Sequence, residues 1–141
     1  MTNRETIKFR VWDKLAERFI KCDEGYQGHY VLSLKGEFHN LQNGSGGDEY
    51  VVQQYTGLTD KNGVEIYEGD IIHYKFDGAL YPKEACDLLL TCIYCPIFGG
   101  YNFNAPNDSY YYAEIRYYYA EIRSYDEVIG NIFENPELLE K

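Results

Sequence analysis

The chain lacks a long apolar segment and an apolar leader. A membrane-spanning helix needs about 18 consecutive, mainly apolar residues, and no stretch of this 141-residue sequence approaches that length. Residues 1–6 are polar and do not form the apolar core of a secretory signal peptide. We therefore expect a cytoplasmic protein that has no membrane anchor.

Positive charge is also scarce. The sequence holds 13 Lys and Arg against 23 Asp and Glu, for a formal net charge of -10, and the basic residues are scattered. An acidic surface repels phosphate, so non-specific binding of DNA or RNA is disfavoured.

Motifs of the common enzyme classes are missing. We find no Gly-x-Ser-x-Gly, Walker A or His-Glu-x-x-His pattern, and His29, His39 and His73 have no partners in a catalytic motif. We accordingly assign no catalytic residue, no cofactor-binding residue, no metal ligand and no cofactor, and we favour a protein that is not an enzyme.

Cysteine is the residue type closest to a chemical motif. Of four cysteines, Cys86, Cys92 and Cys95 lie within ten residues, and the last two form a C-x-x-C. Structural zinc needs four ligands, and only Cys22 and His73, both distant in sequence, would complete such a set. A redox pair usually begins a helix, whereas this one lies inside an apolar run. We favour buried, reduced thiols, with metal binding or redox chemistry as the alternatives.

Aromatic residues are plentiful: the chain has 16 Tyr, 7 Phe and 1 Trp, within a hydrophobic fraction of 45%. That is enough apolar surface for one folded domain. Alternating or continuous apolar runs predict β-strands at 7–13, 19–22, 29–34, 51–55, 70–76, 88–94, 101–103 and 127–133. A glycine in the last run indicates a bulge or a close backbone contact, and Pro136 begins a final helical turn.

In the first strand, alternation places Ile7, Phe9 and Val11 in the core. The other face, which turns outward or toward a second layer, consists of Lys8, Arg10 and Trp12.

Turn residues divide these strands. The segment 60–63 (DKNG) and the segment 68–70 (EGD) both predict tight turns. In the second turn, Asp70 is expected to accept hydrogen bonds from backbone N–H groups. We interpret the acids Glu65, Glu68 and Asp70 as a solvated turn and not as an acid/base site. Residues 43–48 (NGSGGD) predict a hairpin tip, with an inter-subdomain hinge as the alternative.

An exact tandem repeat of YYYAEIR occupies Tyr110–Arg116 and Tyr117–Arg123. Seven residues nearly complete two helical turns, so a helix presents both copies on one face, whereas a strand sends them to opposite faces. We favour the helix and keep the strand as the alternative. Three consecutive tyrosines cannot all be buried on one side, which indicates exposed aromatic surface suited to binding or self-association. The alternative is a partly exposed aromatic face with ordinary core packing beneath it.

Three separated segments share one resemblance. They are IKFRVWD at 7–13, QYTGLTDKNGVEIYEGDII at 54–72 and EVIGNIFENPELL at 127–139. Together they resemble the YopX protein family of small bacteriophage and prophage proteins. The resemblance implies a mostly β fold with an SH3-like element and a phage or prophage origin, and it implies no activity.

We therefore predict a mainly β fold, a small β-barrel or sheet architecture with an SH3-like element and minor helical content near residues 109–125. Residues 1–141 form a single domain, with two small β subdomains sharing a core as a variant. The predicted function is that of an accessory protein that binds a protein partner or itself. The alternative is a nucleic-acid-linked role, or an acidic DNA mimic that acts on a host protein.

Overall fold

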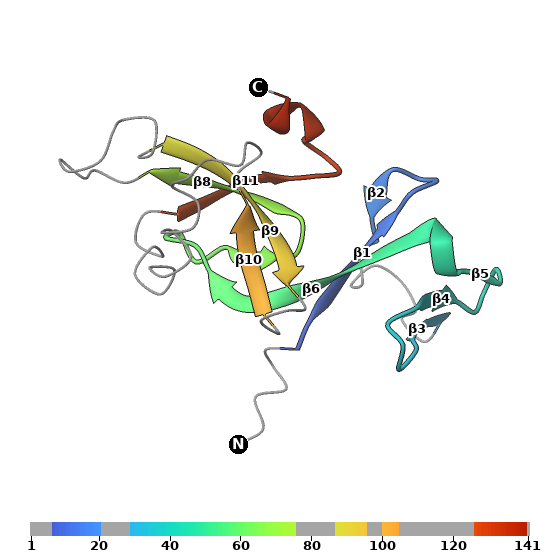
Figure 1. Ribbon diagram of the computed structural model, residues 1–141. Helices are drawn as coiled ribbons and strands as arrows, with labels where there is room; N and C mark the ends of the chain where they lie inside the picture. The colour runs from blue at the N-terminus through green and yellow to red at the C-terminus, as the bar shows by residue number, and fades with distance from the viewer. Residues whose placement is uncertain (1–6, 21–28, 76–86, 96–99, 105–125, 141) are drawn as a thin grey trace, which may run out of the picture.

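The computed structural model describes residues 7–20, 29–75, 87–95, 100–104 and 126–140, and strands dominate these segments (Figure 1). The strands are β1 (Phe9–Asp13), β2 (Arg18–Phe19), β3 (Tyr30–Leu32), β4 (Phe38–Asn40), β5 (Ser45–Gly46), β6 (Tyr50–Thr59), β7 (Glu65–Tyr67), β8 (Asp70–Lys75), β9 (Asp87–Cys95), β10 (Gly100–Asn104) and β11 (Asp126–Asn131). Two short 3-10 helices, η3 (Gly47–Glu49) and η6 (Pro136–Leu139), complete the described elements.

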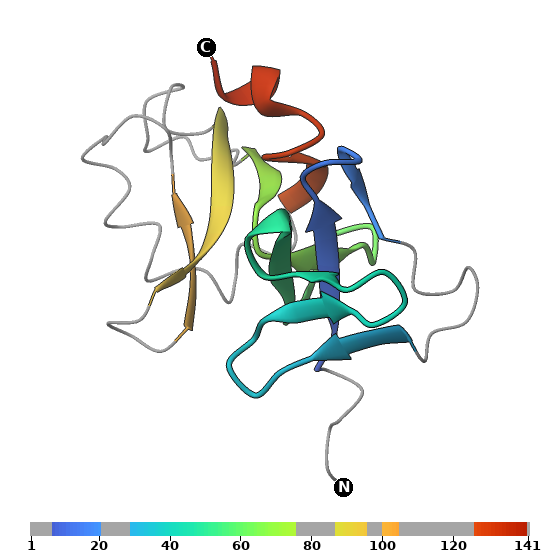
Figure 2. The ribbon, with the colours of Figure 1, turned by 90° about the vertical axis from the view of Figure 1, so that its right-hand side faces the viewer.

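The strands form three antiparallel sheets, with the orders β2-β1-β6-β7, β10-β9-β8-β11 and β3-β4-β5. The ten-residue strand β6 crosses the middle of the molecule in Figure 1, with β8–β11 on its left and β3–β5 on its right. Its first half pairs with β1 and its second half with β7. The view in Figure 2 shows the β9–β10 pair standing apart from β1 across the body of the molecule.

The main core lies where β7 packs against the β8–β11 sheet. It consists of Ile66, Ile72, Tyr74, Leu90, Cys92 and Phe103, with Leu58, Tyr101 and Val128 packed against it. Ile66, Ile72 and Leu90 have no exposed surface at all. Since β7 and β8 are separated only by a two-residue turn, this burial curls the two sheets into a half-barrel around one apolar centre.

The mainly β fold is therefore confirmed. Most predicted strands are present, and both tight turns lie where the sequence placed them. The bulge is confirmed, because the β8–β11 register shifts between Val128 and Gly130. The final turn begins with Pro136 as predicted. The segment 43–48 forms part of the β4–β5 hairpin, although β5 and η3 occupy residues that the sequence predicted as loop. The SH3-like element and the number of domains remain predictions.

One prediction about β1 is wrong. Val11 is buried, but Ile7 and Phe9 remain 60% and 40% exposed, so the predicted apolar face does not continue to the start of the strand. The opposite face is also covered at this end of the strand, because Trp12 is only 7% exposed. Trp12 stacks on Phe133 at 5.1 Å between ring centroids, which confirms contact with a second layer.

The predicted helix at 109–125, including the repeat Tyr110–Arg123, lies outside the described residues. Among the residues that the structure describes, no helix is long and apolar enough to span a bilayer.

Candidate functional site

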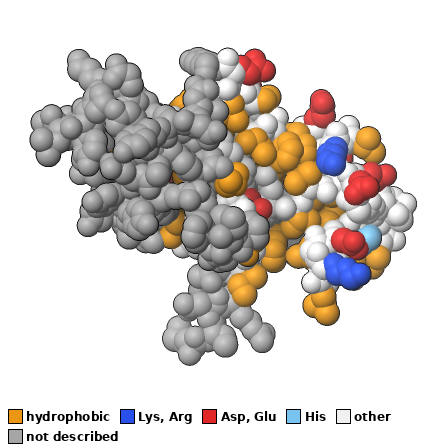
Figure 3. Space-filling view, in the orientation of Figure 1, with side chains coloured by type: hydrophobic (Ala, Val, Ile, Leu, Met, Phe, Trp, Pro, Cys, Tyr) orange, Lys and Arg blue, Asp and Glu red, His pale blue; other side chains and the backbone are white. Residues whose placement is uncertain are grey.

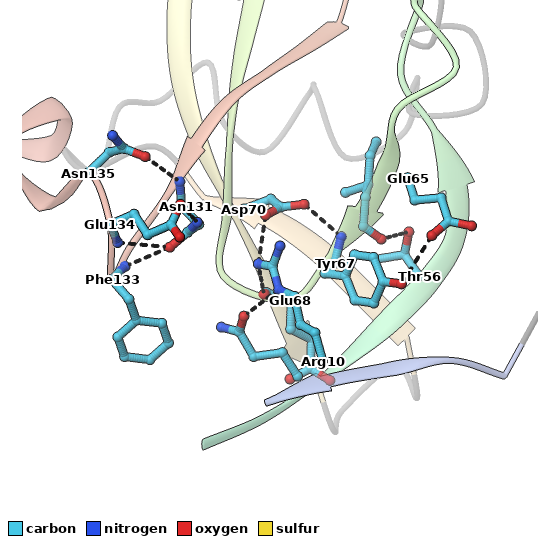
Figure 4. A network of polar contacts seen from close by, with 12 residues as sticks. Arg10, Thr56, Glu65, Tyr67, Glu68, Asp70, Asn131, Phe133, Glu134 and Asn135 are labelled. Atoms are coloured by element: carbon cyan, nitrogen blue, oxygen red, sulfur yellow. Dashed lines mark hydrogen bonds and ion pairs between the residues drawn. The ribbon is translucent and has the colours of Figure 1, made fainter. Parts of the chain in front are cut away.

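The densest polar cluster joins β1 to the turn between β7 and β8 (Figure 4). Arg10 Nη2 donates to Asp70 Oδ1 at 2.7 Å and to the carbonyl oxygen of Glu68 at 3.1 Å. Arg10 Nε donates to Gln53 Oε1 at 2.8 Å. The second oxygen of Asp70 accepts the backbone N–H of Tyr67 at 2.8 Å. We call Arg10, Gln53, Glu68 and Asp70 the Arg10–Asp70 network.

Aromatic rings hold the guanidinium group in place. The guanidinium carbon of Arg10 lies 4.6 Å from the centroid of the Phe19 ring and 4.9 Å from that of the Tyr67 ring. Planar stacking of this kind favours arginine over lysine, since lysine has no planar group to present. The side chain of Arg10 is therefore fixed by two rings and three acceptors.

The turn itself links strands from both large sheets. Glu68 N–H donates to the Gln54 carbonyl, Gly69 N–H donates to the Cys92 carbonyl, and the Gly69 carbonyl accepts the N–H of Ile132. Gly69 has a φ of +80°, and a Cβ there would lie 2.1 Å from Gln53 Nε2. Only glycine satisfies both the left-handed backbone and the close approach of that amide.

Burial shapes the electrostatics of the network. Desolvation raises the pKa of the Asp70 carboxyl, and the Arg10 charge and the Tyr67 N–H oppose that rise. Desolvation likewise raises the pKa of the Glu68 carboxyl. The nearby Cys92 thiol has its pKa raised by burial first and then by the Asp70 and Glu68 charges. A thiol in this environment stays protonated and unreactive.

The geometry of the network suits architecture and not acid/base chemistry. Asp70 is 1% exposed, and both of its oxygens already accept bonds from the protein. A general acid or base must reach the proton of a substrate, and this carboxylate is enclosed. The prediction that Asp70 lies in a solvated turn is thus wrong, because Arg10 supplies a counter-charge and β1 covers it. The prediction that it accepts a backbone N–H is confirmed.

A second buried acid performs a similar task at the β6–β7 turn. Asp60 Oδ1 accepts the N–H groups of Asn62 at 2.8 Å and Val64 at 2.9 Å, and Oδ2 accepts that of Val128 at 2.9 Å. Asp60 is 5% exposed. One carboxylate therefore shapes the hairpin and ties it to β11.

The C-terminal segment is fixed by amide side chains, seen at the left of Figure 4. Asn131 Oδ1 accepts the N–H groups of Phe133 and Glu134, each at 3.0 Å, and Asn135 Oδ1 accepts the N–H of Asn131. This turn places the Phe133 ring against Trp12.

Tyrosines line the outer part of the β6–β7 pair. Tyr67 Oη donates to Glu65 Oε2 at 3.0 Å, and Lys8 forms an ion pair with the other oxygen of Glu65. Burial and the Glu65 carboxylate raise the pKa of Tyr67 to about 12. Lys8 Nζ also lies 5.3 Å from the centroid of the Tyr55 ring, so the amine bridges an acid and an aromatic face.

The end of the β9–β10 pair presents tyrosine to solvent. Tyr94 is 51% exposed and meets Tyr101 edge to face, with 5.7 Å between ring centroids. Tyr101 in turn packs against the main core. Burial, followed by the charge of Glu68, raises the pKa of Tyr101 to about 12. We call Tyr94 and Tyr101 the tyrosine pair.

Among the described residues, the predicted thiol and imidazole candidates form no common cluster. Cys92 is 1% exposed in the strand β9, which confirms a buried free thiol at that position. Cys22 and Cys86 lie outside the described residues, and only the backbone of Cys95 is described. His29 precedes β3 and His39 lies in the neighbouring strand β4, whereas His73 lies in β8 of another sheet. Within the described segments, no three His, Cys, Asp or Glu side chains are grouped to hold a metal ion.

Sequence reasoning missed Arg10 as the partner of Asp70. The two residues are separated by 60 positions, and nothing in the local pattern of either segment indicates their pairing. The only available signal was the alternation that turned Arg10 toward a second layer.

The comparisons with known proteins agree with this architecture. The family model described as YopX protein matches residues 8–140. The chain is also similar to the crystal structure of protein EF1440 from Enterococcus faecalis, with 28% sequence identity and a TM-score of 0.56, over 95% of this chain and 98% of that one. No curated protein matches the chain. A match over nearly the whole length shows the family, and this chain therefore belongs to the YopX protein family.

Proposed function

We propose that this protein is a non-catalytic binding module of bacteriophage or prophage origin that acts in the cytoplasm on a protein partner. The observation that carries the proposal is the tyrosine pair, in which an exposed ring is held by a half-buried one on a rigid sheet. Tyrosine on a fixed backbone offers a large contact area at a low cost in side-chain entropy.

Charge defines the kind of partner. The whole chain carries a formal net charge of -10. Apolar contact on an acidic protein is complementary to a protein surface that combines an apolar side chain with Lys or Arg. The same charge disfavours a phosphate backbone.

The described acids support binding over catalysis. Asp60 and Asp70 are the buried carboxylates of the described segments, and their oxygens accept bonds from backbone N–H groups or from Arg10. Their arrangement stabilises turns and offers no carboxylate to a substrate.

An affinity capture from bacterial host lysate tests the proposal when it compares matched variants. Tyr94→Ser removes the exposed ring, and Ile129→Ser removes an apolar side chain that is 37% exposed on β11. After nuclease treatment, we expect the wild type and Ile129→Ser to recover the same protein partner in equal amounts. Tyr94→Ser should recover at least about fivefold less of it, since buried tyrosine anchors dominate many interfaces.

Two outcomes would overturn the proposal. Loss of the captured material on nuclease treatment would favour a nucleic-acid-linked role. Equal recovery by all three proteins would show that the tyrosine pair is not the binding surface.

A further inference from the structure

The strand β3 (Tyr30–Leu32) lies at the edge of the small sheet and pairs with β4. The hydrogen bonds at its two ends define which side of the strand is paired. Leu41 N–H donates to the His29 carbonyl at 2.7 Å, and Ser33 N–H donates to the Glu37 carbonyl at 2.9 Å. Alternate residues of an antiparallel strand direct their backbone groups to opposite sides. The odd-numbered residues of this strand therefore direct theirs toward β4.

It follows that the N–H and C=O groups of Tyr30 and Leu32 point away from β4. Among the strands that the structure describes, none pairs with this side of β3. Natural proteins usually protect such an edge with a very short strand, a charged residue, a proline or a bulge. The segment Tyr30–Leu32 is short, but it has no charged residue, proline or bulge, and its Val31 and Leu32 side chains are 40% and 38% exposed.

We propose that two copies of this chain associate by pairing these open edges antiparallel, about a two-fold axis at Val31. In that register Val31 faces Val31 of the second copy, and Tyr30 faces Leu32 of the second copy. Because Tyr30 and Leu32 are the residues with outward backbone groups, the two Tyr30–Leu32 pairs form the hydrogen-bonded positions. The small sheets of the two copies then join into one continuous sheet, and the aromatic–aliphatic pairs add to its stability.

A second copy fits this edge because the strand is self-complementary. No charged side chain faces its own counterpart in the proposed register, although each chain carries a net charge of -10. Acidic and basic side chains are mixed at the β3–β5 end of the molecule (Figure 3), where Lys35 and Glu37 follow the strand. Among the described residues, the repulsion between two acidic chains is therefore not concentrated at this edge.

The size of the contact defines the expected strength. An edge of three residues buries far less than the roughly 1,200 Å² of a stable interface. The expected dimer is weak and forms at high protein concentration. It uses a different surface from the tyrosine pair, so either proposal can fail without the other.

Opposite charges placed at Val31, on the proposed two-fold axis, test the register of the strand pair directly. Sedimentation equilibrium is measured over a wide concentration range for the wild type, Val31→Lys, Val31→Glu and an equimolar mixture of the two variants. Like charges placed directly opposite each other destabilise a strand pair. We expect each variant alone to dissociate at least about fivefold more readily than the wild type, and the mixture to recover association through Lys–Glu pairing.

Two further variants separate pairing from folding. Leu32→Pro removes an outward N–H and leaves the bonds to β4 in place, so it should abolish the dimer while circular dichroism stays unchanged. Leu15→Lys adds the same charge as Val31→Lys at a side chain that is 79% exposed in the β1–β2 turn, and it should dimerise like the wild type. A wild type that is monomeric at all concentrations, or a charge-exchange mixture that stays monomeric, would overturn the proposal even if affinity capture recovers a partner.

Discussion

Removal of the Asp70 carboxylate should cost a large part of the stability of the fold. In Asp70→Ala, Arg10 loses its ion pair while its side chain remains only 21% exposed. Breaking a buried pair by removing one partner costs about 3–5 kcal/mol. Arg10 keeps its bonds to Gln53 and to the Glu68 carbonyl, which favours the lower end of that range.

The backbone adds a second contribution. Asp70 Oδ2 accepts the N–H of Tyr67, and a buried donor left without a partner costs about 1–3 kcal/mol. The sum is about 4 kcal/mol, against a total stability of about 5–15 kcal/mol for a domain of ordinary size. Urea unfolding at neutral pH, followed by tryptophan fluorescence of Trp12, measures this difference directly.

Two further proteins make the measurement specific. The double variant Arg10→Met with Asp70→Leu leaves no unpaired charge, and we expect it to lose less stability than Asp70→Ala although it also leaves the Tyr67 N–H without its acceptor. Asp13→Ala removes an exposed carboxylate that accepts the N–H groups of Leu15 and Ala16, and it should cost at most about 1 kcal/mol. If Asp70→Ala loses no more stability than Asp13→Ala, or if the double variant is the least stable of the set, the Arg10–Asp70 ion pair does not make the expected contribution to the free energy of unfolding.

Three other predictions concern the same region. Gly69→Ala should destabilise the protein clearly more than Gly63→Ala in urea unfolding, because both glycines have a φ of +80° but only Gly69 has Gln53 within reach of a Cβ; equal losses would exclude the steric term. Mass spectrometry should find the Cys92 peptide unlabelled by iodoacetamide at pH 8 until the protein unfolds in urea, because the thiol is buried and its pKa is raised; rapid labelling of the folded protein would contradict that burial. The pKa of Tyr67 and that of Tyr101 are raised from 10.0 to about 12, so their contribution to stability is complete below pH 10 and is lost as pH rises through 12. Tyr67→Phe and Tyr101→Phe should reduce this alkaline loss in urea unfolding measured at several pH values, and an unchanged pH profile would count against the two shifts.

Local patterns predicted the elements of this fold better than its contacts. The Asp60 and Gly69 turns could be predicted because asparagine, aspartate and glycine at these positions act on the backbone within a few residues. The bulge before Gly130 was predicted for the same reason. The exposed Ile7 and Phe9 could not be predicted, because alternation identifies the two faces of a strand but not how far a neighbouring layer covers each face.

The Arg10–Asp70 network shows most clearly which contacts local sequence patterns do not predict. A glutamate–glycine–aspartate turn is typically solvated, and only the antiparallel pairing of β1 with β6 brings Arg10 over it. Long-range contacts of this kind depend on strand order, which a single sequence does not specify. The short strands β4 and β5 were missed as strands because two or three residues are too few to show a period.

We propose that the Arg10–Asp70 network maintains the fold, whereas the tyrosine pair binds a protein partner. The most direct test captures the partner with the Arg10→Met and Asp70→Leu double variant, used at a temperature where circular dichroism shows it folded. We predict recovery within about twofold of the wild type, with loss confined to Tyr94→Ser. A folded double variant that no longer recovers the partner would contradict this division of roles and would identify the Arg10–Asp70 network itself as the functional site.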